Sequence, residues 1–115
     1  MKSREDYLRA IYELGDEEGT TTSELAEHLD VSDASASEAI QKLEEDNLVC
    51  RAPYRGFTLS PIGKAEAQKV ARKHQVLREF LEKTLEVEKA EEQADAIEHS
   101  ITEETAEKIK ELNQG

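Results

Sequence analysis

Three residues near the end of the chain, Asp95, Glu98 and His99, have the chemistry of metal ligands. Spacings of three and four residues place their side chains on one face of a helix. Carboxylate oxygens suit hard divalent ions such as Mn2+, and imidazole nitrogens suit Fe2+ and Zn2+. Seen alone, such a triplet is more often a solvated polar face of a helix. The choice between the two interpretations depends on the rest of the chain.

The composition is strongly acidic. The chain has 115 residues, with 27 acidic and 15 basic side chains, and its formal net charge is −12. Residues 1–64 carry 14 acidic and 7 basic side chains, and residues 65–115 carry 13 and 8. Neither part offers the basic lobe that usually attracts nucleic acid, so charge alone argues against DNA binding. The length suits one domain or a domain with a small appendage.

Cysteine usage and the first residues indicate a cytoplasmic protein. The only cysteine, Cys50, excludes an intrachain disulfide and is compatible with a reducing compartment. The segment 1–6 is too charged to begin a signal peptide, and no apolar run approaches the roughly 18 residues of a transmembrane helix. We therefore expect no membrane partner.

The first two helices are predicted from periodicity and caps. Apolar residues recur at helical spacing in residues 7–14, and residues 15–19 form a polar break after them. Thr21 or Thr22 can cap the next helix, because Glu24 completes a capping box with Thr21.

A third helix and a hairpin follow. Ser32 is well placed to cap the third helix, whose inward positions are Ala36, Ile40 and Leu43. Residues 48–51 and 57–59 have the composition of short strands, and residues 53–56 between them have favourable turn chemistry.

The remainder of the chain is predicted to be helical. Ser60 followed by Pro61 is a strong helix start, and an apolar stripe continues from there to Leu81. Two further helices are expected at residues 89–100 and 103–112. The predicted fold is therefore mainly α, with a hairpin after the third helix.

Residues 22–32 have the form of a helix-turn-helix. Small Ala26 lets two helices approach, Leu25 and Leu29 anchor the first helix, and Val31 fills the turn. The hairpin that follows is then the wing. We predict a winged helix-turn-helix domain at residues 1–64 and a helical metal-binding and dimerisation domain at residues 65–115. A three-helix bundle with an incidental hairpin is the alternative.

In a helix-turn-helix the second helix enters the major groove, and its N-terminal residues reach the base edges. Serine hydroxyls suit phosphates or bases, while Asp33 and Glu38 would repel phosphate. Lys42 and Arg55 are the expected backbone clamps. The predicted DNA-binding residues are Thr22, Ser23, Ser32, Ala34, Ser35, Ser37, Glu38, Lys42 and Arg55. Because basic contacts are sparse, we expect weak intrinsic affinity for DNA and a switch that raises it.

Five segments occur in an order that resembles the diphtheria toxin repressor family of metal-dependent transcriptional regulators. They are residues 3–14, 22–32, 53–60, 72–74 and 97–99. The chain is similar to the short, manganese transport regulator-like form without the SH3-like domain. The resemblance implies a homodimer formed through the helices after residue 60, an operator DNA partner and control of metal-uptake genes.

The resemblance also implies a set of metal ligands, namely Asp6, His74, Asp95, Glu98 and His99. Glu98 and His99 match ligands found throughout the family, whereas His74 matches the histidine of a second, neighbouring site. Arg9 and Arg78 stand where family members have carboxylate ligands, and guanidinium has no lone pair to offer a cation. The second site is therefore in doubt, and one or two metals per subunit both stay open.

The oxygen-rich ligand set favours Mn2+, with Fe2+ as the alternative. An ion joining Asp6 on the first helix to the ligands after residue 60 would fix the separation of two recognition helices, which sets operator affinity in dimeric helix-turn-helix proteins. A metal-independent winged-helix regulator and an acidic winged-helix module for protein–protein contacts are the competing interpretations. An enzyme with a small-molecule substrate is the least favoured, because the sequence shows no nucleophile–base pair and no phosphate-binding glycine loop.

Overall fold

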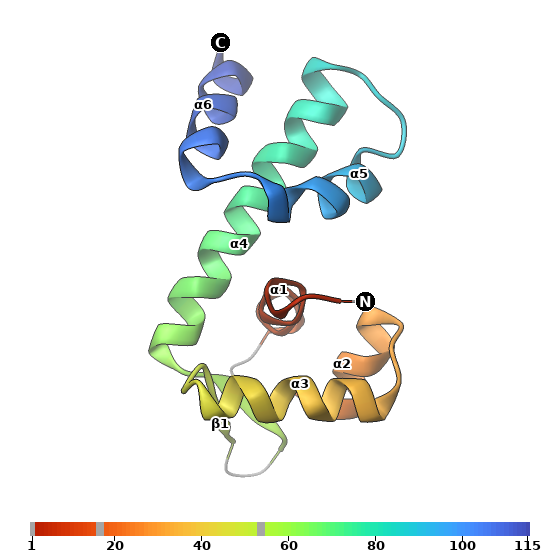
Figure 1. Cartoon of the computed structure of the whole chain (residues 1–115), viewed down its shortest axis with the longest axis vertical. Coiled ribbons are helices and arrows are strands. Elements are labelled where there is room, and N and C mark those ends of the chain that lie inside the picture. Colours follow the sequence, from red (N-terminus) through yellow and green to blue (C-terminus); the bar gives the residue numbers. More distant parts are fainter. Residues whose placement is uncertain (1, 16–17, 53–54) are drawn as a thin grey trace. The chain divides into compact units, whose positions relative to one another are not determined.

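Figure 1 shows the computed structural model of the chain, which describes residues 2–15, 18–52 and 55–115. The structure is mainly helical, as predicted, and contains one small two-stranded sheet within the described residues. It divides into two compact units, an N-terminal unit of residues 1–68 and a C-terminal unit of residues 69–115. Each unit is described by itself.

The first three helices of the N-terminal unit begin at side-chain caps. The unit contains α1 (Arg4–Leu14), α2 (Thr22–Leu29), α3 (Asp33–Glu45), β1 (Val49–Arg51), β2 (Phe57–Leu59) and the first part of α4 (Pro61–Glu79). The Ser3 and Thr21 side chains each accept the third backbone N–H of their helix, and a carboxylate from that third residue returns the bond, which completes a capping box. Ser32 caps α3 by accepting the backbone N–H of Ser35. The predicted helix starts at Thr21 and Ser32 are confirmed.

The turn between α2 and α3 follows the helix-turn-helix pattern. Asp30 ends α2 in the left-handed conformation, with φ of 55°. The backbone N–H of Val31 then donates to the carbonyl of Ala26 at 3.0 Å. Val31 is half-buried against the core, and Ala26 is buried where α2 approaches α3. The predicted roles of both residues are confirmed.

The two strands form the predicted wing. They pair antiparallel with Val49 opposite Leu59, and Phe57 also bridges to Thr20 just before α2. This bridge fastens the wing to the chain segment that leads into the helix-turn-helix. The predicted turn includes Pro53 and Tyr54, which lie outside the described residues, as do residues 16–17 of the predicted polar break.

The N-terminal unit has one core, which includes the first residues of α4. Its largest fully buried side chains come from α1, from α2, from the residue before β1, and from β2. They are Leu8, Ile11, Leu25, Leu48 and Phe57. Ser60 begins α4 as predicted, because its Oγ accepts the Gly63 N–H at 3.0 Å and donates to the Asn47 carbonyl at 2.7 Å. A Cβ at Gly63 would overlap the Leu48 carbonyl oxygen, so α4 closely approaches the backbone of the residue before β1.

The C-terminal unit is built from the remaining helices. They are the rest of α4, a π-helix η2 (Phe80–Thr84), α5 (Ala90–Ile97), a 3-10 helix η3 (Glu98–Ser100) and α6 (Glu103–Gln114). Leu77, Leu81, Ala90 and Ala94 form its core. The predicted helix at 89–100 is thus an α-helix followed by a 3-10 turn, and the predicted helix at 103–112 is confirmed.

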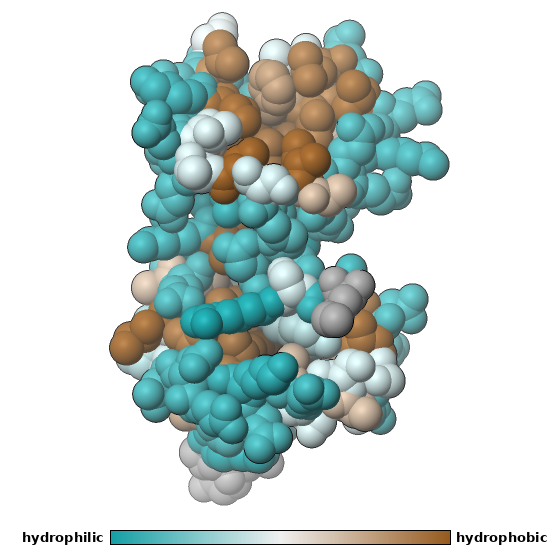
Figure 2. Space-filling model, in the orientation of Figure 1, coloured by the Kyte–Doolittle hydropathy of each residue, from teal (hydrophilic) through white to brown (hydrophobic). Residues whose placement is uncertain are grey.

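Large apolar side chains are also exposed on the C-terminal unit. Leu85, Ile97 and Leu112 have 51%, 40% and 62% of their surface exposed. Figure 2 shows brown, apolar residues gathered on the face of this unit that is turned to the viewer. In the part of the chain that the structure describes, no helix has both the length and the apolar character needed to cross a membrane.

Candidate metal centre and nucleic-acid interface

The C-terminal unit brings three predicted metal ligands together. His74 lies on α4 with only 7% of its surface exposed. Its Nδ1 is 3.2 Å from Oε2 of Glu98 and 3.3 Å from Oδ1 of Asp95. One donor atom from each of the three residues lies within 4.8 Å of the other two. Two carboxylates and an imidazole therefore converge from three helical segments, α4, α5 and η3.

The local structure explains why Asp95 and Glu98 reach the same histidine. They stand three residues apart across the junction of α5 and η3, so their side chains share a face. Glu98 is fully buried, and burying a carboxylate is costly unless it is paired. Two oxygen donors and one nitrogen donor match what Mn2+ and Fe2+ accept, and a divalent ion would balance the buried negative charge. The residues present fit a divalent cation.

The other two predicted ligands have defined surroundings of their own. His99 follows Glu98 in η3, and its Nε2 lies 3.8 Å from Oε1 of Glu98. Asp6 belongs to the first turn of α1, where its Oδ2 accepts the backbone N–H of Ser3 at 2.9 Å. Its carboxylate thus already serves as half of a capping box. Ligand roles for Asp6 and His99 stay predictions.

Two further groups lie beside the His74 cluster. Nε2 of His74 is 2.9 Å from Oε1 of Glu91, a residue that the sequence analysis does not identify. The signal for it is spacing, because Glu91 lies four residues before Asp95 on the same face of α5. Nε of Arg78 is 3.7 Å from the other carboxylate oxygen of Glu91, while its Nη1 donates to Glu82 at 2.9 Å. Glu91 extends the cluster beyond the predicted set.

Most predicted DNA contacts lie on the exposed side of α3. Ser32, Ala34, Ser35, Ser37, Glu38 and Lys42 are all exposed, as are Ser23 and Arg55, while Thr22 is half-buried at the start of α2. Ser32 and Ser35 bond to each other at the N-terminus of α3. Lys42 pairs with Glu38 at 3.6 Å, so its charge is partly compensated within the helix. The exposed face of α3 is therefore accessible to a DNA groove, but it carries little positive charge.

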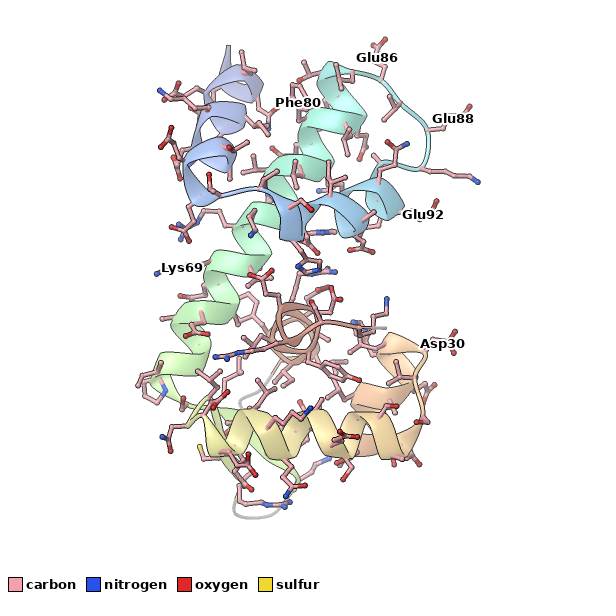
Figure 3. The ribbon with its side chains drawn as sticks, in the orientation of Figure 1. Asp30, Lys69, Phe80, Glu86, Glu88 and Glu92 are labelled. Carbon is pink, nitrogen blue, oxygen red and sulfur yellow. The ribbon has the colours of Figure 1, made fainter. Side chains whose placement is uncertain are left out.

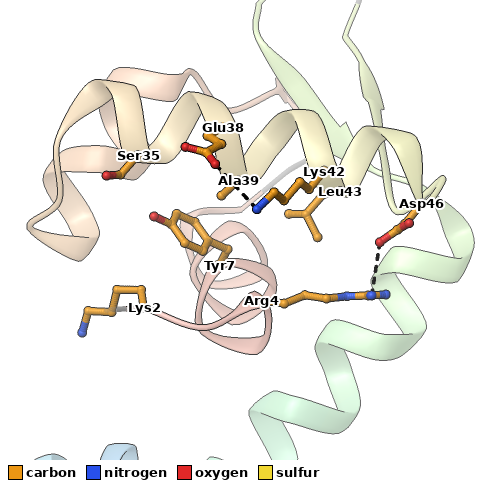
Figure 4. A pocket seen from close by; sticks show the side chains of 9 residues that line it. All are labelled: Lys2, Arg4, Tyr7, Ser35, Glu38, Ala39, Lys42, Leu43 and Asp46. Carbon is orange, nitrogen blue, oxygen red and sulfur yellow. Dashed lines mark hydrogen bonds and ion pairs between the residues drawn. The ribbon is translucent and has the colours of Figure 1, made fainter.

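A pocket of about 620 Å3 lies between α3 and the start of α1 (Figure 4). Its lining includes Lys2, Arg4 and Lys42 beside the hydroxyl groups of Tyr7 and Ser35. Arg4 reaches Asp46 at 3.2 Å and Glu66 at 3.5 Å. Burial, followed by the negative charges of Asp6 and Glu38, raises the pKa of Tyr7 above its usual value. Lys2 and Arg4 are cations next to α3 that helix-turn-helix reasoning does not reveal, because they precede the motif.

Arg55, for which DNA contact stays a prediction, links the wing to α2 and to the segment before it. Its Nη2 pairs with Oε1 of Glu24, and its Nη1 donates to the Gly19 carbonyl at 3.0 Å. Hydrogen bonds from Arg55, and then from Thr21, hold the pKa of Glu24 below its usual value. Arg55 is still partly exposed, with 45% of its side-chain surface accessible.

Sequence comparison covers both units. The family model described as "Iron dependent repressor, N-terminal DNA binding domain" matches residues 1–57, and that described as "Iron dependent repressor, metal binding and dimerisation domain" matches residues 60–114. The chain belongs to the iron dependent repressor family. The resemblance inferred from the motifs is confirmed, as is the winged helix-turn-helix followed by a dimerisation domain.

Members of the family with known structures or curated names are similar to the chain. The transcriptional regulator MntR of Geobacillus thermodenitrificans is 39% identical over 80 residues, which is 69% of this chain and 57% of that protein. The manganese regulator SloR is 29% identical, with a TM-score of 0.85, and the match covers 97% of this chain and 54% of SloR. IdeR of T. acidophilum is 28% identical, with a TM-score of 0.87 over 100% of this chain and 55% of IdeR. The chain thus spans little more than half the length of these relatives.

Each candidate site lies in the part of the chain that matches the family domain with that role. The cluster of His74, Asp95 and Glu98 falls within the match to the metal binding and dimerisation domain. Helix α3 falls within the match to the DNA binding domain. His28 and Cys50, the other histidine and the cysteine of the chain, are both exposed in the N-terminal unit.

Proposed function

We propose that the chain is a metal-dependent, DNA-binding transcriptional regulator that represses metal-uptake genes when Mn2+ is bound, with Fe2+ as the alternative ion. One observation carries the proposal. A fully buried Glu98, a half-buried Asp95 and a buried His74 meet within hydrogen-bonding distance in an iron dependent repressor fold. Such a concentration of acidic groups around one imidazole is what a bound divalent ion would stabilise.

Support for manganese comes from the donors and from the relatives. Oxygen donors outnumber nitrogen donors in the cluster, and no sulfur is present among these three residues, which favours the harder ion. Relatives with matching folds are named as manganese regulators, and one was solved with manganese bound. Asp6 and His99 are proposed as the remaining ligands on the basis of the family resemblance. Binding the ion supplies fixed positive charge to this acidic site.

Operator DNA and a second copy of the chain are the proposed partners. The exposed serines of α3 offer hydroxyl groups to bases or phosphates, and Lys2, Arg4 and Lys42 offer cations beside that helix. Exposed Leu85, Ile97 and Leu112 give the C-terminal unit the apolar surface that a homodimer would cover. We propose residues 1–64 and 65–115 as the DNA-binding and dimerisation domains, and the cytoplasm as the location. No catalytic activity is proposed.

A DNA-binding titration tests this function. An operator is first selected from random DNA in the presence of Mn2+, and its affinity is then measured by fluorescence anisotropy with Mn2+ and with a chelator. Allosteric coupling of about 1–3 kcal/mol predicts tightening of about 5- to 150-fold by Mn2+. Glu98→Gln should lose this response while remaining folded, whereas Glu104→Gln, an exposed change on α6, should keep it.

Each competing function predicts a different result. Equal operator affinity with Mn2+ and with chelator, together with a melting temperature that ignores Mn2+, would indicate a metal-independent regulator. Failure to select any DNA sequence, with Mn2+ still raising the melting temperature, would indicate a metal-binding module that acts on other proteins.

A further inference from the structure

The two ring nitrogens of His74 face different groups within the C-terminal unit. Nδ1 faces the carboxylates of Asp95 and Glu98, at 3.3 and 3.2 Å. Nε2 faces the carboxylate of Glu91, whose Oε1 lies 2.9 Å away. Glu91 lies on the first turn of α5 with 57% of its side chain exposed, so it approaches the ring from the solvent side.

These two nitrogens cannot play the same role when the ring holds an ion. A neutral imidazole carries a proton on one nitrogen and a lone pair on the other, and the hydrogen bond made by the first decides which nitrogen binds metal. Carboxylates commonly accept the N–H of a metal-bound histidine and so fix both its tautomer and its orientation. At His74 the carboxylate at the Nε2 end would keep the proton there, and Nδ1 would face the two candidate ligands.

Arg78 completes this arrangement. Its Nε is 3.7 Å from Oε2 of Glu91, while Oε1 of the same carboxylate faces His74. Glu91 is therefore held between a permanent cation and an imidazole N–H. Because the guanidinium of Arg78 partly compensates the negative charge of Glu91, this carboxylate attracts a second metal ion less strongly.

We propose that Glu91, oriented by Arg78, is a positioning residue that holds the proton on Nε2 of His74, so that Nδ1 binds a single divalent ion together with Asp95 and Glu98. The inference depends on the metal-binding part of the proposed function and is independent of DNA. It also assigns one ion per chain to this cluster, since Glu91 accepts a hydrogen bond instead of binding a second ion.

The expected effect of removing Glu91 follows from its exposure. Loss of a hydrogen-bonding partner behind a metal ligand typically weakens metal binding about 10- to 100-fold. Both Glu91 and Arg78 are partly exposed, at 57% and 35%, so water screens their interaction. We expect a loss near the lower limit, about 10-fold, for Glu91→Ala. Glu91→Gln should stay close to wild type, because its amide oxygen still accepts the Nε2 proton.

The test is a Mn2+ titration of the full chain by calorimetry, without DNA. Wild type should bind one ion at this cluster, Glu91→Ala should bind the same number about 10-fold more weakly, and Glu91→Gln should restore the affinity. Glu92→Ala is the matched control, because Glu92 neighbours Glu91 on α5 and extends outward from the helix (Figure 3). It should bind as wild type does.

A spectroscopic measurement separates positioning from a general structural effect. In the Zn2+-loaded chain, 15N NMR of the His74 ring should show a protonated Nε2 in wild type and in Glu91→Gln, and an altered or mixed signal in Glu91→Ala. The proposal is overturned if Glu91→Ala binds Mn2+ as tightly as wild type does. It is also overturned if wild type binds two ions and Glu91→Ala binds only one. A wild-type chain that binds no Mn2+ overturns the proposed function itself.

Discussion

Replacing Gly63 by alanine tests how closely α4 and the wing are packed. Gly63 is buried in the first turn of α4, and a Cβ there would overlap the carbonyl oxygen of Leu48 and lie 2.8 Å from its carbonyl carbon. The obstructing atoms belong to the backbone, so no side-chain rotation can relieve the overlap. The same carbonyl accepts the Ser60 N–H at 2.9 Å, which adjoins the cap of the helix.

Two opposing effects decide the sign of this substitution. Helix propensity favours alanine over glycine by about 1 kcal/mol. Shifting the Leu48 carbonyl weakens its hydrogen bond to Ser60, which costs about 1 kcal/mol, and overpacking a close contact costs about 1–3 kcal/mol more. The first two contributions nearly cancel, so Gly63→Ala should lower the free energy of unfolding of the N-terminal unit by about 1–3 kcal/mol.

Amide hydrogen exchange measures this unit separately from the other. The amides of Leu8 and Ile11, two residues of α1 with fully buried side chains, should exchange faster in Gly63→Ala by the factor corresponding to that free energy. Lys64→Ala is the control, because Lys64 is exposed at the next position and its substitution adds no atom near Leu48. If Gly63→Ala protects these amides as well as or better than wild type, the close contact between α4 and the wing is wrong.

Two further predictions concern the DNA-binding surface. Arg55→Ala should raise the pKa of Glu24 towards its usual value of 4.5, because the hydrogen bond from Arg55 is the main cause of the lowered pKa. With a lowered pKa in the folded state, the stabilisation by this pair is present above the unfolded pKa and is lost as pH falls through the folded one. An NMR titration of the Glu24 carboxyl with an unchanged midpoint would contradict this. Lys42→Ala should reduce the slope of log affinity for operator DNA against log salt by about 1, while Lys108→Ala in α6 should leave it unchanged. Equal slopes in the two variants would remove Lys42 from the phosphate contacts.

The helix starts could be predicted because their signals are local. Thr21 with Glu24, and Ser32 before α3, satisfy backbone N–H groups within one turn, so residue type and spacing are sufficient. The irregular end of α4 could not be predicted from the sequence. The apolar stripe of α4 continues to Leu81 without a break, although the backbone changes to a π-helix at Phe80. The π-helix packs against α5 and α6, and a periodic pattern does not report such tertiary contacts.

In the candidate site, too, some residues could be predicted from sequence patterns, whereas the contacts between distant residues could not. Asp95 and Glu98 were recognisable from spacing, and His74 from the family motif, because both signals lie in the sequence itself. The approach of Glu91 to His74 depends on how α5 packs against α4, which no local pattern states. The pairing of Arg55 with Glu24 joins residues 31 positions apart and escapes sequence reasoning for the same reason. Long-range ion pairs of this kind require the structure.

The ion pair between Arg55 and Glu24 bears on the predicted contact of Arg55 with a DNA phosphate, because Glu24 already occupies part of the guanidinium. A phosphate group that binds Nη2 of Arg55 would compete with Glu24 for it, and the nearby carboxylate would repel that same phosphate. We therefore expect a phosphate contact at this position to exchange one partner of Arg55 for another, with little net gain in affinity. In the proposed DNA complex, such a wing would favour duplexes that also fit α3, because only their other contacts would offset the loss of this ion pair.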